Sequence, residues 1–214
     1  SASGTDDCGD VSITVSEVIV EGTCNGSYEI HRTFTAEDPC LNTTSGVQIV
    51  TVFDDQAPDL VAPEDYTVEC SEFIQYAPAT TTDNCGSFVI NENETIIPGS
   101  SDGNYSIIRT FVAFDDCGNI SSATQTITVV DTTAPVLSIP ADYTIECSEE
   151  LVYASASAID ACGSVFISES IEIVEGNAAG NYVVQRTFVA VDDSGNESSA
   201  TQTITVVDTT APTL

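Results

Sequence analysis

Apolar and polar residues alternate along most of the chain, which is the two-residue period of a half-buried β-strand. Clusters rich in Asp, Gly, Asn and Pro separate the alternating runs and mark turns. In the last third of the chain the expected strands are Val136–Ile139, Tyr143–Cys147, Leu151–Ile159, Val165–Val174, Tyr182–Val191 and Ala200–Val207. No segment shows the apolar period of a helix, so the pattern predicts an all-β protein.

The same pattern recurs at a fixed interval of 77 residues. The stretch from Arg186 to Pro212 occurs again from Arg109 to Pro135 with three changes, and a more diverged copy runs from Arg32 to Pro58. A constant period of this kind is typical of a chain built from repeated structural units.

Six or seven short strands in about 77 residues are typical of a small β-sandwich. The sequence therefore predicts tandem antiparallel β-sandwich repeats of immunoglobulin or fibronectin-III type in a rod-like array. The expected bounds are a partial first repeat at 1–54, a second repeat at 55–131, a third at 132–208 and the start of a further one at 209–214. The chain would then begin inside a repeat, as a window cut from a longer array.

Charge narrows the classes of partner. The net charge is −31, with 34 acidic residues and three basic ones, so nucleic acid and anionic membrane surfaces are poor partners. Such acidity is common in disordered chains, but here the 42% hydrophobic content is arranged in alternating runs. Neither a signal peptide nor an apolar run long enough to span a bilayer is present in this window.

The three arginines share one repeat position on the apolar face of a strand, as Arg32, Arg109 and Arg186. A buried guanidinium needs a carboxylate partner, and Glu69 and Glu146 are the expected partners. A structural anchor is favoured over a ligand-binding arginine at this position.

A tyrosine also recurs once per repeat, after a glycine-rich turn, as Tyr28, Tyr105 and Tyr182. These residues resemble tyrosine-corner residues and are expected to be structural. Catalysis has little to draw on, because the lone His31 lies on a polar strand face and the paired carboxylates recur in every repeat. We expect no enzyme.

Several motifs together resemble one family. The runs TVEC at 67–70, DNCG at 83–86, DDCGN at 115–119 and QTITVVDTTAP at 125–135 are similar to the hyalin-repeat-like modules of Bacteroidota surface proteins. Among these, the giant gliding-motility adhesins exported by the type IX system are the most similar. The resemblance implies a secreted, cell-surface, non-enzymatic repeat protein of immunoglobulin-like fold. Ser194 and Ser101 depart from it, since both stand where other repeats have cysteine.

Eight cysteines in a chain of this composition indicate an oxidising, extracellular setting. The chain contains no Cys-x-x-Cys pair and a single histidine, which argues against structural zinc. The eight cysteines occupy four positions within the repeat. The first holds Cys70 and Cys147, the second Cys8, Cys85 and Cys162, the third Cys24, and the fourth Cys40 and Cys117.

Two pairing schemes and free thiols stay open. A sequence-local scheme joins Cys70–Cys85, Cys147–Cys162 and Cys24–Cys40. Each of these bridges would span one strand of about ten residues, roughly 30 Å long, whereas a disulfide needs Cα atoms within about 7 Å. A geometric scheme joins Cys8–Cys40 and Cys85–Cys117 within repeats and Cys70–Cys162 between repeats. In this scheme Cys24 would pair upstream of this window, and Cys147 is directed to a following module.

The same geometry gathers carboxylates where one repeat meets the next. The residues expected there are Asp54, Asp55, Asp83, Asp115, Asp116, Asp131, Asp160, Asp192, Asp193 and Asp208. Clustered carboxylates repel one another unless a cation joins them, and Ca²⁺ accepts six to eight oxygens. The arrangement resembles cadherin junctions. The alternative is a set of turn-forming and solvated loop acids.

Glycans and adhesion complete the hypotheses. Asp-Thr-Thr matches a Bacteroidota O-glycosylation signal and indicates Thr132 and Thr209, whereas the six Asn-x-Ser/Thr sequons are weak evidence alone.

The favoured function is a stalk segment of an extracellular, cell-surface adhesin that bears load between cell and substrate. The alternatives are a self-assembling filament or sheath and a carbohydrate-binding module. The expected partners are neighbouring repeats, other copies of the chain and surface polysaccharide.

Overall fold

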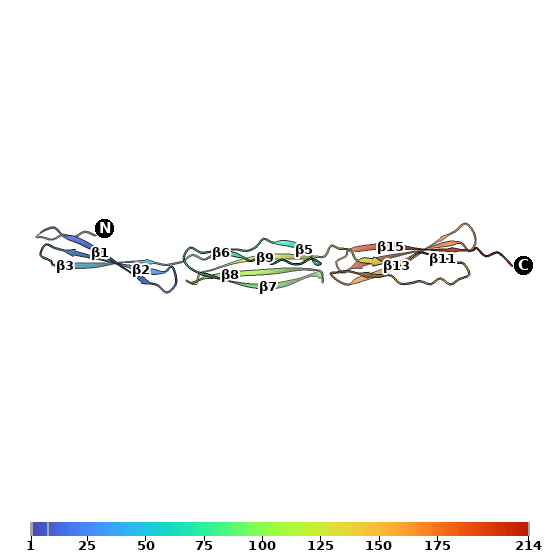
Figure 1. Cartoon of the computed structure of the whole chain (residues 1–214), viewed down its shortest axis with the longest axis horizontal. Helices are drawn as coiled ribbons and strands as arrows, with labels where there is room; N and C mark the ends of the chain where they lie inside the picture. Colours follow the sequence, from blue (N-terminus) through green and yellow to red (C-terminus); the bar gives the residue numbers. More distant parts are fainter. Residues whose placement is uncertain (1, 8, 214) are drawn as a thin grey trace. The chain divides into compact units, whose positions relative to one another are not determined.

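The computed structural model describes residues 2–7 and 9–213 and is all-β over those residues (Figure 1). The first sheet contains β1 (Ser12–Glu21), β2 (Tyr28–Glu37) and β3 (Thr43–Val52). Six strands follow: β4 (Asp59–Val61), β5 (Tyr66–Glu69), β6 (Thr80–Thr82), β7 (Phe88–Ser101), β8 (Asn104–Asp115) and β9 (Ile120–Val130). The last six are β10 (Val136–Ser138), β11 (Tyr143–Glu146), β12 (Ser157–Ile159), β13 (Val165–Glu175), β14 (Tyr182–Asp192) and β15 (Glu197–Val207).

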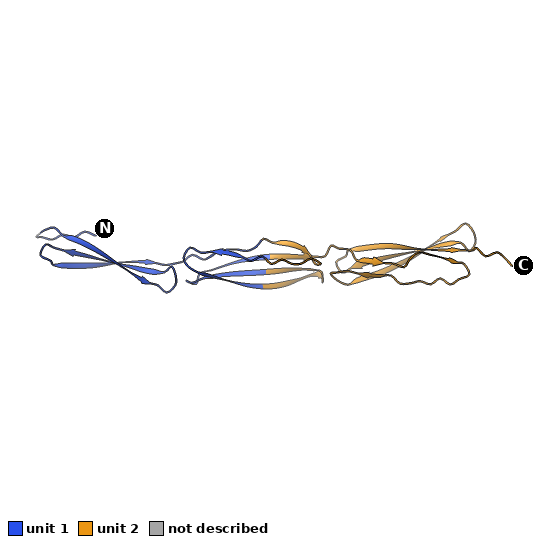
Figure 2. Cartoon of the chain, viewed as in Figure 1, with its two compact units in different colours: residues 1–63, 77–93, 109–125 blue, residues 64–76, 94–108, 126–214 orange. Residues whose placement is uncertain are grey.

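The chain divides into two compact units (Figure 2). Unit 1 comprises residues 1–63, 77–93 and 109–125, and unit 2 comprises residues 64–76, 94–108 and 126–214. The division falls inside the second sequence repeat, because β7, β8 and β9 each run through both units. Consequently, residues on the two sides of each repeat boundary lie within a single unit.

The third repeat shows the sheet arrangement most completely. One sheet has the order β11-β15-β14-β13, and a second sheet pairs β10 with β12. Contacts of β10 with β15 and of β12 with β13 close the two sheets into a sandwich. The second repeat has the same strand orders, β5-β9-β8-β7 and β4-β6. The predicted fold class, tandem β-sandwich modules, is confirmed.

Two details of the sheets differ from the prediction. β5 and β11 join their sheets in parallel rather than antiparallel orientation, with Tyr143 opposite Ile204 in β15. The strand expected over Leu151–Ile159 is reduced to Ser157–Ile159. The preceding backbone bonds to side chains instead of a ladder, because Val152 accepts from the Tyr143 hydroxyl and Ala154 from Arg186.

Alternate residues of the central strands form the core. In β14 and β15 the buried apolar side chains are Val184, Phe188, Ala190, Ile204 and Val206, each at most 2% exposed. Burying one large apolar side chain stabilises the fold by about 1.5–3 kcal/mol. The second repeat buries the equivalent residues Ile107, Phe111, Ala113, Ile127 and Val129.

The repeated arginine lies within this core. The Arg186 side chain is 3% exposed, and its Nε donates to Glu169 at 2.7 Å. Its Nη1 donates to Gln202 and its Nη2 to the Ala154 carbonyl, while the guanidinium stacks on the Phe188 and Tyr153 rings. All its polar groups are therefore directed to partners, as burial requires.

The carboxylates that pair with the arginines are not the ones expected from the sequence. Arg109 donates to Glu92 as Arg186 does to Glu169, and Arg32, 39% exposed, donates to Glu17. Each of these glutamates lies on the strand paired antiparallel to the arginine's strand, whereas the expected Glu69 and Glu146 bind threonines.

The tyrosine-corner expectation also meets a difference. The hydroxyl-to-backbone bonds that we observe belong to Tyr66 and Tyr143, which donate to Gln75 and Val152. Tyr105 packs against the core cluster of Val68, Ile107, Ile127 and Val129, while Tyr28 and Tyr182 lie half-buried at the first positions of β2 and β14.

A search of the described residues for an apolar helix of membrane-spanning length finds none.

Candidate functional site: the repeat junctions

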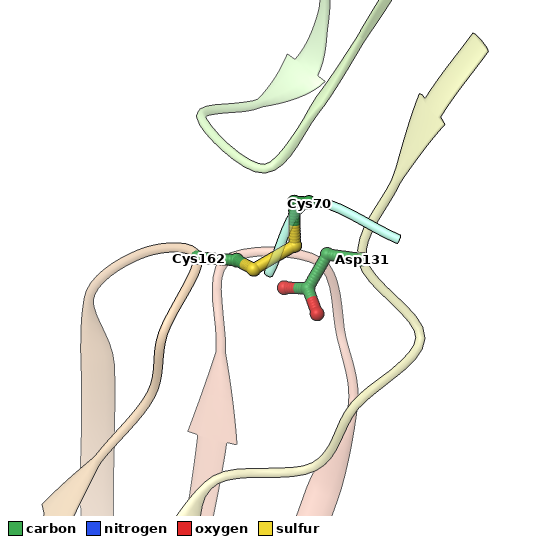
Figure 3. Close-up of side chains that lie close together, drawn as sticks. All are labelled: Cys70, Asp131 and Cys162. Carbon is green, nitrogen blue, oxygen red and sulfur yellow. A yellow bond between two sulfur atoms is a disulfide. The ribbon is translucent and has the colours of Figure 1, made fainter. Parts of the chain in front are cut away.

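A disulfide crosses the junction between the second and third repeats. Cys70, directly after β5, is bonded to Cys162 in the loop after β12, and their Cα atoms are 5.9 Å apart (Figure 3). The inter-repeat pair Cys70–Cys162 expected from the sequence is thus present. The sequence-local alternative would have used both sulfurs elsewhere.

A second disulfide crosses the junction between the first and second repeats. Cys24 in the turn after β1 is bonded to Cys117 in the turn after β8, with Cα atoms 5.1 Å apart. The expected Cys85–Cys117 pair is therefore wrong, and Cys85 is unpaired. The cause is the one that produces Cys70–Cys162: the far end of one repeat meets the loops at the near end of the next.

The two disulfides occupy different positions in equivalent junctions. Ser101 and Ser194 stand 77 residues after Cys24 and Cys117, and their hydroxyl oxygens are 3.0 Å apart. The Asn104 amide donates to both hydroxyls, at 2.7 and 2.8 Å. A polar contact thus replaces, in the second junction, the covalent bond of the first.

The expected Cys8–Cys40 pair includes Cys8, which lies outside the described residues. Among those that are described, Cys40, Cys85 and Cys147 are unpaired. Burial and the nearby charges of Asp54, Asp83 and Asp115 raise the pKa of Cys85, which lowers its thiolate fraction and its reactivity at neutral pH.

Glycines allow the close approach at these junctions. A Cβ on Gly103 would lie 2.9 Å from the carbonyl oxygen of Cys162, and a Cβ on Gly26 would lie 2.9 Å from that of Cys85. Gly26 also has a φ of +93°, which disfavours other residues. Each turn therefore packs directly on the backbone of the next repeat's cysteine loop.

Three carboxylates converge at each junction. Asp54, Asp83 and Asp115 each present one oxygen within 4.8 Å of the others, and so do Asp131, Asp160 and Asp192. Asp131 also lies beside the Cys70–Cys162 disulfide (Figure 3). The two sets are equivalent, since their members are 77 residues apart.

Several oxygens in these triads have no hydrogen-bond donor. Asp131 is 6% exposed, and its Oδ2 is buried without a partner. The Oδ2 atoms of Asp54 and Asp83 are in the same condition. A buried carboxylate oxygen without a donor is costly, and a cation with oxygen ligands would remove that cost.

The third member of each triad is held ionised by its own loop. Burial opposes ionisation of Asp115, but hydrogen bonds from the Asn119 side chain and backbone and from the Cys117 and Gly118 backbone outweigh it and lower the pKa. The pKa of Asp192 is lowered in the same way by Asn196 and its neighbours. Both Asn side chains also donate across the junction, to the Asp54 and Asp131 carbonyls.

The structure does not bring the other predicted acids into the triads. Asp116 accepts from Ser87 and Asp193 from Ser164, each within its own repeat. Asp55 is exposed, and Asp208 is an exposed equivalent of Asp131 at the end of the third repeat. Of the acids expected at each of these two junctions, three thus converge.

The two threonines expected to carry glycans are hydrogen-bonded. The Thr132 hydroxyl donates to Glu69 at 2.9 Å, and the Thr209 hydroxyl donates to Glu146. These backbone and hydroxyl donors lower the pKa of both glutamates.

Comparison with known families supports a hyalin-repeat-like module. Residues 58–129 match the model of the HYR-like domain with 4 cysteines. This region spans the second repeat, from Pro58 in the linker to Val129 in β9.

Two curated proteins named Hyalin are similar over most of the chain. The Strongylocentrotus purpuratus protein is 33% identical over 199 residues, which cover 84% of this chain and 16% of that protein. The Lytechinus variegatus protein is 31% identical over 202 residues, or 85% of this chain and 38% of its own length. The chain thus spans well under half of either relative.

Solved cadherin structures are similar at low identity. A protocadherin gammaB7 EC3-6 structure matches 94% of this chain and 67% of its own, at 15% identity and a TM-score of 0.36. Drosophila N-cadherin EC1-4 matches 86% of this chain and 58% of its own, at 13% identity and a TM-score of 0.33. These likenesses are weak, and the fold assignment rests on the sheets described above.

Proposed function

We propose that this chain is a load-bearing segment of a secreted, cell-surface repeat adhesin, in which successive modules transmit force between cell and substrate. One observation carries the proposal: each of the two junctions contains a disulfide between neighbouring repeats. Single-repeat stability would not need bonds in these places, whereas a chain under tension would gain from them. The role is structural rather than enzymatic.

The two disulfides also overlap along the sequence. One encloses residues 24–117 and the other residues 70–162. Every peptide bond between residues 24 and 162 is therefore bypassed by at least one disulfide. Tension applied at the two termini would not fully extend the chain even if all the strands separated.

Calcium at the junctions is part of this proposal. The three converging carboxylates and the buried Asp131 oxygen without a donor support it. Oxygen-only ligand sets suit Ca²⁺, and extracellular modules bind it with dissociation constants of about 10⁻⁴–10⁻³ M. The ion would neutralise the triad and stiffen the joint between repeats.

The remaining attributes are extensions of the same proposal. An extracellular location agrees with the disulfides and with the hyalin-like module. A role in bacterial gliding rests on the motif resemblance alone, since the curated relatives are hyalins of other organisms. Glycans on Thr132 and Thr209 would require those hydroxyls to leave Glu69 and Glu146.

Single-molecule stretching tests the load-bearing function. At about 3.5 Å per residue, the fully reduced chain extends over all 214 residues, whereas the oxidised chain has a taut path of about 120 residues. The expected difference is roughly 330 Å. Because the loops overlap, the C24S/C117S and C70S/C162S variants should each keep nearly the full shortening. Only the variant lacking both disulfides should lose it, and equal extension of all forms would contradict the proposal.

Self-assembly into a filament is a second candidate, supported by the first sheet. Apolar side chains on β1 and β3 are exposed, namely Val15, Val18, Ile19, Val47 and Ile49, each at least 53%. An exposed edge of this composition can pair with another chain. Light scattering over a concentration series separates the candidates: growth in mass that V18E or V47E suppresses favours assembly, and a constant monomer mass favours the stalk.

A further inference from the structure

We propose that the end of the third repeat that carries Cys147 is a docking face for the loop end of a further repeat of this kind, and that Cys147 forms a disulfide with the loop cysteine of that repeat. The inference rests on the proposed function, because it takes the junction to be a unit that recurs. It concerns the end of unit 2 that no loop of another repeat covers among the described residues.

The hydrogen bonds around Asp131 and Cys70, at the junction between the second and third repeats, recur around Asp208 and Cys147. We call that junction, where a loop of the third repeat covers the end of the second, the occupied junction. In the occupied junction Asp131 N donates to Asn104 Oδ1 at 3.1 Å, and Cys70 N donates to the Val130 carbonyl at 2.8 Å. The equivalent bonds at the Cys147 end run from Asp208 N to Asn181 Oδ1 at 2.7 Å and from Cys147 N to the Val207 carbonyl at 2.8 Å. The docking face is therefore preformed.

What differs between the two ends is cover. Asp131 is 6% exposed and Cys70 is half-buried and bonded to Cys162. Asp208 and Cys147 are exposed, and Cys147 is unpaired. The same groups that are covered in one junction thus lie open at the Cys147 end, in the same backbone geometry.

The repeat arithmetic accounts for every cysteine found unpaired in the described ranges. The observed disulfides join residues 92 or 93 positions apart. In each, the cysteine from the end of the earlier repeat comes first in the sequence. Cys147 and Cys85 are equivalents of Cys70 and Cys162, so their partners would stand 92 positions after and before them, respectively. Cys40 is the equivalent of Cys117, with a partner 93 positions earlier. All three positions fall outside residues 1–214.

The span of the bond has a mechanical consequence. A separation of 92 residues exceeds the 77-residue repeat, so bonds in successive junctions overlap. A Cys147 bond would begin before Cys162 and would therefore continue the covalent bypass beyond the third repeat. Ala178 occupies the position of Cys24 and Ser101, which makes Cys147 the one covalent tie expected in that junction.

The bond forms by ordinary thiol–disulfide exchange. The thiols of Cys147 and of the incoming loop cysteine each lose a proton and together lose two electrons. A small-molecule disulfide such as oxidised glutathione accepts them and leaves as two reduced thiols. An extracellular compartment supplies oxidants of this class.

A chain extended by one repeat tests the proposal. A copy of residues 138–214 is appended after Leu214, so that the appended equivalent of Cys162 becomes residue 239, which is 92 positions after Cys147. In the appended copy the equivalent of Cys147 is replaced by serine and the equivalent of Ala161 by valine, so that each appended peptide differs in sequence from its counterpart. After oxidation with a glutathione redox buffer, non-reducing peptide mapping should find Cys147 joined to the appended Asp-Val-Cys-Gly loop. Alkylation of Cys147 should fall from nearly complete in the 214-residue chain to nearly absent.

The controls separate the possible failures. Serine in place of the appended loop cysteine should return Cys147 to full alkylation. If Cys70–Cys162 forms while Cys147 stays alkylated, or if Cys147 bonds to any other cysteine, the docking proposal is overturned and the load-bearing function stands. Absence of the Cys70–Cys162 bond in the same sample would remove the proposed function and this inference together.

Discussion

At the scale of single residues, equivalent positions in the repeat can differ in how deeply their side chains are buried. Arg32 and Arg186 stand at the same repeat position, yet their side chains are 39% and 3% exposed. The alternating pattern placed both on the apolar face and predicted a carboxylate partner. It could not identify Glu17 or Glu169, because the choice depends on the register between neighbouring strands, which alternation alone does not encode.

This difference in cover predicts unequal effects of removing the two arginines. Arg186→Ala leaves the buried Gln202 oxygen without its donor and the partly exposed Glu169 without its ion-pair partner, so we expect a loss of about 1–3 kcal/mol. Arg32→Ala should cost at most about 1 kcal/mol, as for an exposed ion pair. Denaturant unfolding followed by far-UV circular dichroism measures both. Equal losses would show that the buried network contributes nothing special.

Asp131 and Asp208 provide a matched pair for the calcium proposal. Ca²⁺ at about ten times its dissociation constant should stabilise the occupied junction by about 1.4 kcal/mol, which raises the melting temperature by several degrees. Asp131→Asn should abolish the part of the shift that comes from its own junction and keep the part from the Asp54, Asp83 and Asp115 triad. In EGTA the same variant should be slightly more stable than wild type, because carboxylate repulsion is relieved.

The control is Asp208→Asn, which removes the same charge where no triad is formed. It should leave the calcium response of the melting temperature unchanged. If wild-type protein melts at the same temperature with calcium and with EGTA, junction calcium is excluded.

At the scale of elements, the loops and turns at the ends of the sandwich determine how repeats connect. The sequence predicted Cys70–Cys162 because it placed one cysteine at each side of a junction. For Cys24 the expected partner upstream of this window is wrong, because Cys24 is bonded to Cys117. A signal was present, since Cys24 and Cys117 occur together and are replaced together by Ser101 and Ser194. The parallel addition of β5 and β11 left no such signal, because a two-residue period is identical in both strand directions.

The serine pair predicts that the second junction can accept a second disulfide. Their hydroxyl oxygens are 3.0 Å apart, and the equivalent cysteines are bonded in the first junction. The S101C/S194C variant should oxidise spontaneously, lose the mass of two hydrogens and gain about 2–4 kcal/mol of stability.

The single variants S101C and S194C serve as controls, because each adds one thiol without a partner. Persistence of both new thiols in the oxidised double variant would contradict the equivalence of the two junctions.

At the scale of the whole molecule, neighbouring repeats are covalently tied by disulfides that overlap along the chain. The fold class, the 77-residue period and the presence of junction acids could be predicted from residue patterns. Of the two disulfides only Cys70–Cys162 was expected, because a pairing between repeats depends on which ends of successive repeats meet in space. A family resemblance could indicate adhesion, but the mechanical argument comes from the bond positions.

Cleavage at one inserted protease site tests whether the overlapping disulfides hold the chain together. A site at Glu150, in an exposed loop, lies within 117–162 and is bypassed only by Cys70–Cys162, whereas a site at Asp55 is bypassed only by Cys24–Cys117. After complete cleavage at either site, we expect one species of full mass on a non-reducing gel and two fragments once reductant is added. Two fragments without reductant would contradict this expectation.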